Sequence, residues 1–332
     1  MNTITFLYRF SFFILFLSLT ISCDDDDNNN VLGVENPRPL IYDVLRNNEN
    51  TYGTLLAALE KADLENEIRE SGRSVTLLAP TNEAFNQFLD GRTLDDFTAE
   101  QLESVLLYHI VPGNLDVDQV TDDMSVYAST SAQGPNDIDD NNTQLSMLFS
   151  TTNDQLIVNG GSANGGAAIR LTDTIPSNGV LHQVDRILLR PTLNTFLNTD
   201  SSLSELKSLV ETTFTTGIFE TENTPFTFFA PIDTAVEAQR ETLNTLSEEQ
   251  VRKLLQQHVV TKQNVIVANI ASLAEGQTAA TLLGDDFKLT LDAAEVTVTN
   301  GPTTAKIDQS QTIQTDNGVL HRIDTVLIPE NL

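Results

Sequence analysis

The feature that most constrains this chain is an internal duplication. The segment Asn178–Leu189 (NGVLHQVDRILL) returns near the C-terminus as Asn317–Ile328 (NGVLHRIDTVLI). Earlier pieces repeat in the same order, because Val75–Phe85 (VTLLAPTNEAF) corresponds to Phe226–Val236 (FTFFAPIDTAV). Long matches at a near-constant spacing indicate two copies of one folding unit, each large enough to bury its own core. The sequence therefore predicts two similar domains in tandem.

Each copy combines strand and helix signals. In the first copy a short apolar strand runs into Pro80 and a helix is expected after it, and Pro231 holds the same position in the second copy. Proline ends a strand and suits the approach to a helix. The next helix of each copy starts at a capping box, Thr98–Gln101 or Ser247–Gln250. In such a box a hydroxyl and an amide satisfy free backbone N–H groups reciprocally.

The chain has four histidines, and each lies on an apolar face: His109, His182, His258 and His321. Two of them close apolar stripes at helical spacing, and the other two are flanked by β-branched residues on one face of a strand. We expect these rings to be buried and hydrogen-bonded, because a buried imidazole needs partners. The expected partners are Thr76 or Thr81 and the nearby backbone.

Turn and periodicity signals complete the pattern. The Asn-Gly pair that opens each long repeat predicts a tight hairpin turn, since both turn positions accept positive φ. Helices are expected at residues 41–45, 52–69, 82–89, 99–110, 193–197 and 203–212. Further strands are expected at residues 125–127, 144–149, 155–158, 168–171, 277–283, 288–291, 295–299 and 305–309.

Charge and residue usage narrow the function classes. The formal net charge is −29, which argues against nucleic acid partners because a phosphate-binding surface is basic. No tryptophan is present, so a sugar cleft of stacked aromatic rings is harder to build. The single cysteine, Cys23, excludes an intrachain disulfide.

The N-terminus has the pattern of a secretory signal. Residues 1–22 hold Arg9 and then an apolar run, and the sequence LTISC that ends at Cys23 resembles a bacterial lipoprotein cleavage box. The resemblance implies cleavage before Cys23, acylation of that residue and membrane attachment through several acyl chains. Residues 23–37 begin with Asp24–Asp27 and read as an acidic flexible tether. We expect a lipid-anchored protein of the bacterial outer membrane, exposed on the outer face; a plain signal peptide is the alternative.

These motifs together resemble the fasciclin domain. The residues that carry the resemblance are the TLLAP run from Thr76, the Tyr108-His109 pair and the NGVLH run from Asn178, and the second copy repeats them from Thr227, at His258 and from Asn317. The resemblance covers about residues 38–190 and 191–329, and the two expected domains are residues 38–190 and 191–332. It implies an α+β fold, in which each domain is a wedge-shaped β-sandwich fringed by α-helices. It also implies cell adhesion or contact with extracellular matrix.

The two copies are unequal at the motif residues. In the family, the Tyr-His pair is linked to adhesion, and Tyr108-His109 keeps it while the second copy has Gln257-His258. Thr81 corresponds to Ile232, which removes a hydroxyl. Tyr108 and His109 are therefore candidate adhesion contacts of the first domain, whereas the helical periodicity places His109 in the interior. The other motif positions, Thr76, Pro80, Thr81, His182, Pro231, His258 and His321, are expected to be structural.

The sequence carries no motif of an enzyme. It has no Gly-x-Ser-x-Gly elbow, no His-Glu-x-x-His helix and no phosphate loop, so we expect no catalytic residue, metal or cofactor. The expected partner is an extracellular protein or glycan, with a glycan-binding accessory lipoprotein of an outer-membrane polysaccharide uptake system as the alternative function.

The first copy has about ten more residues than the second, which we place in the polar run 129–142. Calcium binding by its aspartates is a further alternative.

Overall fold

The computed structural model describes residues 38–115, 117, 120, 125–171, 176–213, 225–272, 278–282, 286–292, 295–300 and 302–328. By their contacts, residues Arg38–Leu332 form one compact unit. The predicted signal sequence, Cys23 and the tether lie outside the described residues. Within that described part, no helix combines the length and apolar character needed to span a bilayer.

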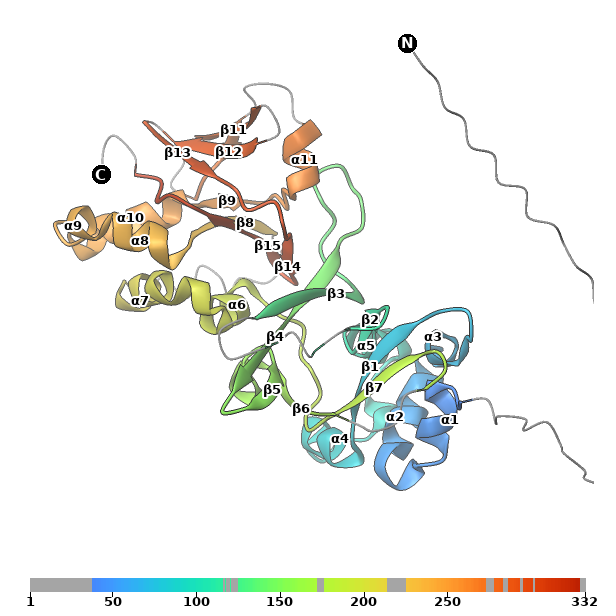
Figure 1. Cartoon of the computed structure of the whole chain (residues 1–332). Coiled ribbons are helices and arrows are strands. Elements are labelled where there is room, and N and C mark those ends of the chain that lie inside the picture. The colour runs from blue at the N-terminus through green and yellow to red at the C-terminus, as the bar shows by residue number, and fades with distance from the viewer. Residues whose placement is uncertain are drawn as a thin grey trace, which may run out of the picture. The chain divides into compact units, whose positions relative to one another are not determined.

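The helices of the first predicted domain pack on one face of its sheet (Figure 1). They are α1 (Ile41–Arg46), α2 (Glu49–Lys61), α3 (Glu65–Arg69), α4 (Asn82–Leu89) and α5 (Ala99–Leu107), with a short 3-10 turn at Leu94–Asp96. The predicted single helix over 52–69 is wrong, because the chain turns at Asp63 (φ 56°) and brings Leu64 and Ile68 into the core beside Leu59. The predicted helix end at Ile110 is also wrong, since Ile110 pairs with Leu77 in a strand.

The strands of the first domain form one seven-stranded sheet in the order β2-β1-β7-β6-β5-β4-β3. They are β1 (Val75–Pro80), β2 (Ile110–Pro112), β3 (Val126–Gln133), β4 (Gln144–Thr152), β5 (Gln155–Val158), β6 (Ala167–Leu171) and β7 (Gly179–Val184). β1 runs parallel to β7, with Leu78 opposite His182. Leu77 packs in the helical cluster, whereas Leu78 packs with Met147 and Phe149 of β4. Both faces of β1 are therefore buried, between helices and strands.

The second domain repeats this plan with two four-stranded sheets, β14-β15-β8-β9 and β10-β11-β12-β13. Its strands are β8 (Phe226–Pro231), β9 (Val259–Thr261), β10 (Thr278–Ala280), β11 (Asp286–Asp292), β12 (Glu295–Asn300), β13 (Thr303–Lys306), β14 (Ile313–Thr315) and β15 (Gly318–Ile323). Its helices are α6 (Leu193–Thr199), α7 (Ser204–Thr212), α8 (Asp233–Ala238), α9 (Arg240–Leu243), α10 (Glu248–Gln257) and α11 (Val267–Ser272), with a 3-10 turn at Ser201–Leu203. β15 runs parallel to β8 as β7 does to β1. The α+β fold predicted for both copies is confirmed.

The predicted tight hairpin turn forms at the second Asn-Gly pair, where Thr315 of β14 pairs with Gly318 of β15 across Asp316-Asn317. Only the glycines have positive φ, 151° at Gly179 and 149° at Gly318, and each is the first residue of its strand. The side chain of Asn178 accepts a hydrogen bond from the N–H of Ile41 at 2.8 Å and donates to the carbonyl of Ile68 at 2.9 Å. Asn178 therefore fastens the first helix of the domain to the central strands, and only the predicted positive φ at both positions of the pair is wrong.

Candidate functional site

His109 lies inside the first domain, just after the last turn of α5. Its side chain is fully buried. The ring Nδ1 lies 2.9 Å from the carbonyl of Val105, and the backbone N–H of Leu188 donates to Nε2 at 2.9 Å. Because Nε2 accepts, Nδ1 carries the proton and the ring is neutral. Burial lowers the pKa of His109 to about 4, away from its ordinary value of 6.5.

The second domain repeats this arrangement at His258. Its Nδ1 lies 2.8 Å from the carbonyl of Leu254, and the N–H of Leu327 donates to Nε2 at 3.0 Å. Burial lowers the pKa of His258 to about 4 as well. Each imidazole therefore joins a helix end to the chain segment that follows the last parallel strand of its domain.

The strand histidines are also buried, as the alternation along their strands predicted. His321 is fully buried, its Nε2 lies 2.7 Å from the carbonyl of Val265, and its ring stacks on Phe229. Burial lowers its pKa to about 4. His182 is 6% exposed and lies opposite Leu78 of β1.

The threonines expected to hold these rings bond elsewhere. Thr76 donates through its hydroxyl to the carbonyl of Gly113 at 2.9 Å and accepts from the N–H of Leu115 at 2.8 Å. Thr81 caps α4, because its hydroxyl accepts from the N–H of Ala84. The predicted pairing of threonine with histidine is wrong, because strand ends and helix ends need these hydroxyls for their own backbone groups.

Tyr108, the other member of the candidate adhesion pair, is fully buried too. Its hydroxyl donates to the carbonyl of Ser146 at 2.9 Å and accepts from the side-chain amide of Asn159 at 2.9 Å. The oxygen of that amide accepts from the N–H of Leu148 at 3.0 Å. Burial raises the pKa of Tyr108 well above its ordinary value. The pair thus supports β4 from inside and presents no ring surface to a partner.

Strand β4, which Tyr108 supports, also carries the contact between the domains. The hydroxyl of Ser146 donates to the carbonyl of Thr312 at 3.2 Å and accepts from the N–H of Gln314 at 2.9 Å. Leu148 packs in the helical cluster of the second domain, beside Phe196. The sequence repeats did not reveal this role, since a duplicated pattern describes each copy alone.

The extra polar run 129–142 of the first copy also contacts the second domain. Asp137 accepts hydrogen bonds from the N–H groups of Asp139 and Asn141, both at 2.9 Å, and from the amide of Asn269 at 3.0 Å. Asp139 accepts from the same amide at 2.8 Å. These donors use the carboxylate oxygens that calcium would need. Among the residues that the structure describes, no group of three or more His, Cys, Asp and Glu side chains is arranged to hold a metal.

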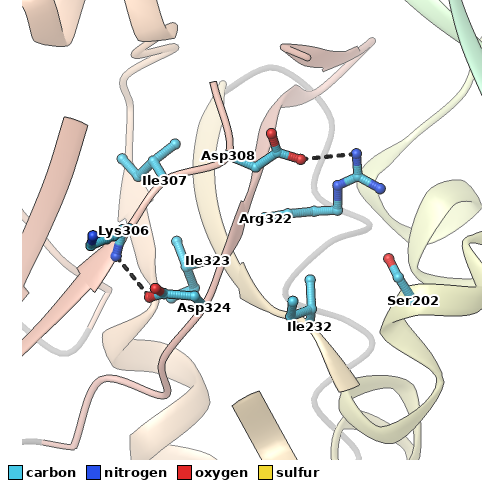
Figure 2. Close-up of a pocket in the computed structure, with 8 residues that line it drawn as sticks. All are labelled: Ser202, Ile232, Lys306, Ile307, Asp308, Arg322, Ile323 and Asp324. Carbon is cyan, nitrogen blue, oxygen red and sulfur yellow. Dashed lines mark hydrogen bonds and ion pairs between the residues drawn. The ribbon is translucent and has the colours of Figure 1, made fainter. Parts of the chain in front are cut away.

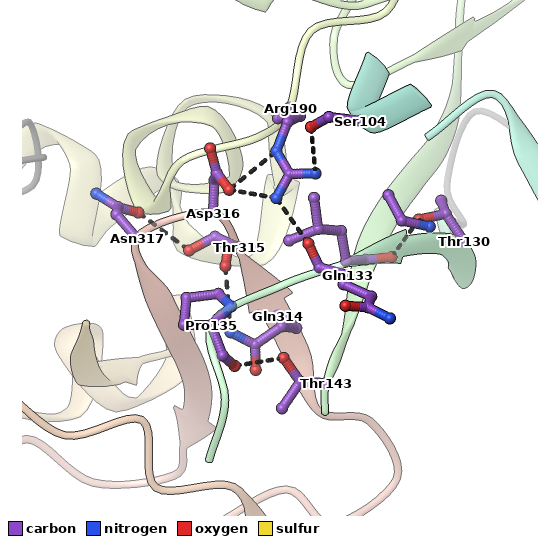
Figure 3. A network of polar contacts seen from close by, with 12 residues as sticks. Ser104, Thr130, Gln133, Pro135, Thr143, Arg190, Gln314, Thr315, Asp316 and Asn317 are labelled. Atoms are coloured by element: carbon purple, nitrogen blue, oxygen red, sulfur yellow. Dashed lines mark hydrogen bonds and ion pairs between the residues drawn. The ribbon is translucent and has the colours of Figure 1, made fainter. Parts of the chain in front are cut away.

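Arg190, at the junction between the domains, ties both of them together (Figure 3). Its Nε donates to Asp316 at 2.9 Å, and its other guanidinium nitrogens donate to the carbonyl of Gln133 at 2.6 Å and the hydroxyl of Ser104 at 3.1 Å. A planar guanidinium can hold several acceptors in a fixed geometry. The interface is therefore defined by directional polar contacts as well as by apolar packing.

The opposite end of β3 contacts a second cluster of polar side chains. The hydroxyl of Tyr127 donates to the buried carboxylate of Asp200 at 3.0 Å, and Arg322 lies 3.7 Å from the same carboxylate and 3.1 Å from Asp308. Asp308 and Arg322 face each other in a pocket of about 390 Å³ with an isoleucine floor that includes Ile232 (Figure 2). Arg322 pairs with Asp308 there, and Asp324 accepts a hydrogen bond from the backbone N–H of Lys306 at 2.8 Å.

Comparison with known proteins places this geometry in a family. The sequence matches the fasciclin domain at residues 50–190 and 201–329. Protein sll1483 of Synechocystis is 30% identical over 46% of this chain and 73% of its own length. Fasciclin-1 of Schistocerca americana is 24% identical over 81% of this chain, which spans about two fifths (41%) of that relative.

A solved structure has the same fold. It is a FAS1 domain pair from the insect cell adhesion molecule fasciclin I, and it aligns with a TM-score of 0.50 at 17% identity. The alignment covers 87% of this chain and 96% of the insect pair. With its two matched segments and this shared fold, the chain belongs to the fasciclin domain family.

Proposed function

We propose that this protein is a non-catalytic adhesion lipoprotein that binds an extracellular protein or matrix component at the cell surface. The observation that carries the proposal is the tandem pair of fasciclin domains, whose fold matches a pair from an insect cell adhesion molecule. The buried, neutral histidines favour a structural role for the repeated motifs, because a neutral ring without solvent access is a poor acid or base at neutral pH. Nucleic acid is not an expected partner, given the charge of −29.

In this proposal Tyr108 and His109 stabilise the first domain and do not themselves contact the adhesion partner. We expect Tyr108→Phe to lower the free energy of unfolding by roughly 1–3 kcal/mol, since the change leaves Asn159 and the carbonyl of Ser146 without a buried partner. Attachment of cells to immobilised protein should remain unchanged well below the melting temperature. Urea unfolding and a cell-attachment assay measure the two effects.

The matched control is Tyr42→Phe. Tyr42 is half-buried under the guanidinium of Arg69 in α3, a contact that uses the ring rather than the hydroxyl. This variant should stay within about 0.5 kcal/mol of the wild type. Attachment that disappears in Tyr108→Phe at unchanged stability would instead make the pair a direct contact.

The membrane anchor is a separate part of the proposal and rests on Cys23. The acylated cysteine would hold the protein in the outer membrane, and residues 23–37 would separate the two domains from the lipid surface. We expect Cys23→Ser to lose incorporation of a labelled fatty acid and to leave the membrane fraction. A variant that keeps the label or stays membrane-bound would contradict lipidation at this residue.

A second candidate function is that of a glycan-binding accessory lipoprotein for polysaccharide uptake at the outer membrane. The observation that favours it is a pocket between the domains lined by uncharged polar side chains. Binding of the full chain to an array of oligosaccharides tests this candidate, and an array without any signal would contradict it.

A further inference from the structure

A pocket of about 440 Å³ lies between the two domains, where β3 and β4 face the segment that leads into β14. Its volume falls in the range of roughly 300–1,000 Å³ that is usual for small-molecule sites. The residues that line it are Ser129, Ser131, Gln133, Asn142, Thr143, Gln144, Ile266, Thr312 and Gln314. Figure 3 shows Gln133 and Thr143 of the first domain near Gln314 of the second. Both domains are thus needed to build it.

The lining has an unusual chemistry for so acidic a chain. It contains hydroxyl and amide side chains and one isoleucine, with no charged group and no aromatic ring. An anion would find no cation there, and a cation would find no carboxylate. An apolar ligand would leave the polar groups without partners, which costs free energy. The ligand that fits is uncharged and carries many hydroxyl groups, because amides and hydroxyls both donate and accept hydrogen bonds.

Some side chains that line the pocket are held by hydrogen bonds within the protein, whereas others are available to bond to a ligand. Gln314 is saturated, since its amide donates to the carbonyl of Gly318 at 2.7 Å and exchanges hydrogen bonds with Asn264. Thr143 donates to the carbonyl of Pro135 at 2.7 Å. Six other side chains make no hydrogen bond with the rest of the described chain: Ser129, Ser131, Gln133, Asn142, Gln144 and Thr312. A specific binding site needs a preorganised framework and polar groups that are available to bond to the ligand.

We propose that this pocket binds a short neutral oligosaccharide. The inference rests on the second candidate function, glycan binding, and names the class of glycan. An extended peptide fits less well. A peptide that adds to the edge of a sheet needs regularly spaced backbone groups. The pairing of β3 with β4 shifts register between Ser129 and Gln133, which breaks that spacing. Because the ligand contacts both domains, it also stabilises their docked arrangement.

The test uses the full chain and a glycan array that carries neutral and acidic oligosaccharides, followed by calorimetry on the neutral ones that bind. The wild type should bind neutral oligosaccharides with an affinity that is the same at low and high salt, since no charge is involved. The double variant Gln133→Ala/Gln144→Ala should bind about tenfold more weakly, as two hydrogen-bonding groups are lost. Unfolding curves check that this variant remains folded.

The matched control is Gln155→Ala. Gln155 is an exposed amide at the first position of β5, as Gln144 is at the first position of β4, but it does not line the pocket. This variant should bind like the wild type. Neutral glycan binding that survives in the double variant would overturn the pocket assignment and leave the glycan-binding candidate standing. Binding restricted to acidic glycans, or no binding at all, would overturn both.

Discussion

Gly179→Ala should lower the free energy of unfolding of the first domain by roughly 4 kcal/mol or more. Gly179 has a φ of 151°, and an added Cβ would lie 1.8 Å from the carbonyl oxygen of Val75. Val75 belongs to the parallel strand at the centre of the domain and bonds to the carbonyl of Asn178. Relief of the clash would therefore separate β1 from β7, the strands between the two core clusters. Urea unfolding measures the effect.

The duplication supplies a second test of the same argument. Gly318 has a φ of 149°, and its added Cβ would lie 2.1 Å from the carbonyl oxygen of Phe226. Gly318→Ala should destabilise the second domain by a similar amount. Gly72→Ala is the control, because Gly72 is exposed and an added Cβ meets no atom within 4 Å. A Gly179→Ala protein within about 1 kcal/mol of the wild type would contradict the close strand approach.

The buried histidines should make the protein less stable as the pH falls below neutrality. In the folded state burial lowers the pKa of His109, His258 and His321 to about 4, whereas the ordinary value is 6.5. The unfolded chain therefore binds protons between these values and the folded protein does not. The stabilisation is complete above about pH 6.5 and is lost as the pH falls towards 4, by about 2 kcal/mol for each ring at pH 5.

Carboxylates also take up protons in part of this pH range. The effect of the histidine is therefore measured as the difference in unfolding free energy between a variant and the wild type. His258→Gln should be less stable than the wild type at about pH 7.5, because its side chain cannot reproduce both ring contacts. The variant lacks the titrating ring, so the gap in unfolding free energy should shrink by about 2 kcal/mol at about pH 5. A gap that does not change with pH would show that the ring is equally accessible in both states.

Much of the fold was predictable because its local signals agree with its tertiary contacts. The capping boxes at Thr98 and Ser247 form with Gln101 and Gln250, as their spacing predicted. The helix over 82–89 has the predicted limits. Burial of the histidines followed from helical and strand periodicity, which reports the face of an element that meets the core.

The remaining features depend on contacts that no local pattern records. The break at Asp63 lets α3 turn back onto the core, and the polar run 129–142 folds against Asn269 of the second domain. The same run was a calcium candidate because its carboxylates are close in sequence. Two of them also accept hydrogen bonds from the distant amide of Asn269, which sequence spacing does not reveal. Tyr108 was a candidate contact through family resemblance, and it is buried because it packs with Met147 and Phe149 of the distant strand β4.

The histidines of the fasciclin motifs are neutral and support the interior of each domain. The most direct measurement is an NMR titration of the histidine ring protons in the folded protein from about pH 8 to about pH 5. We expect the signals of His109, His258 and His321 to stay at the positions of neutral imidazole throughout this range. A ring among these three that titrates near its ordinary pKa of 6.5 while the protein remains folded would contradict it.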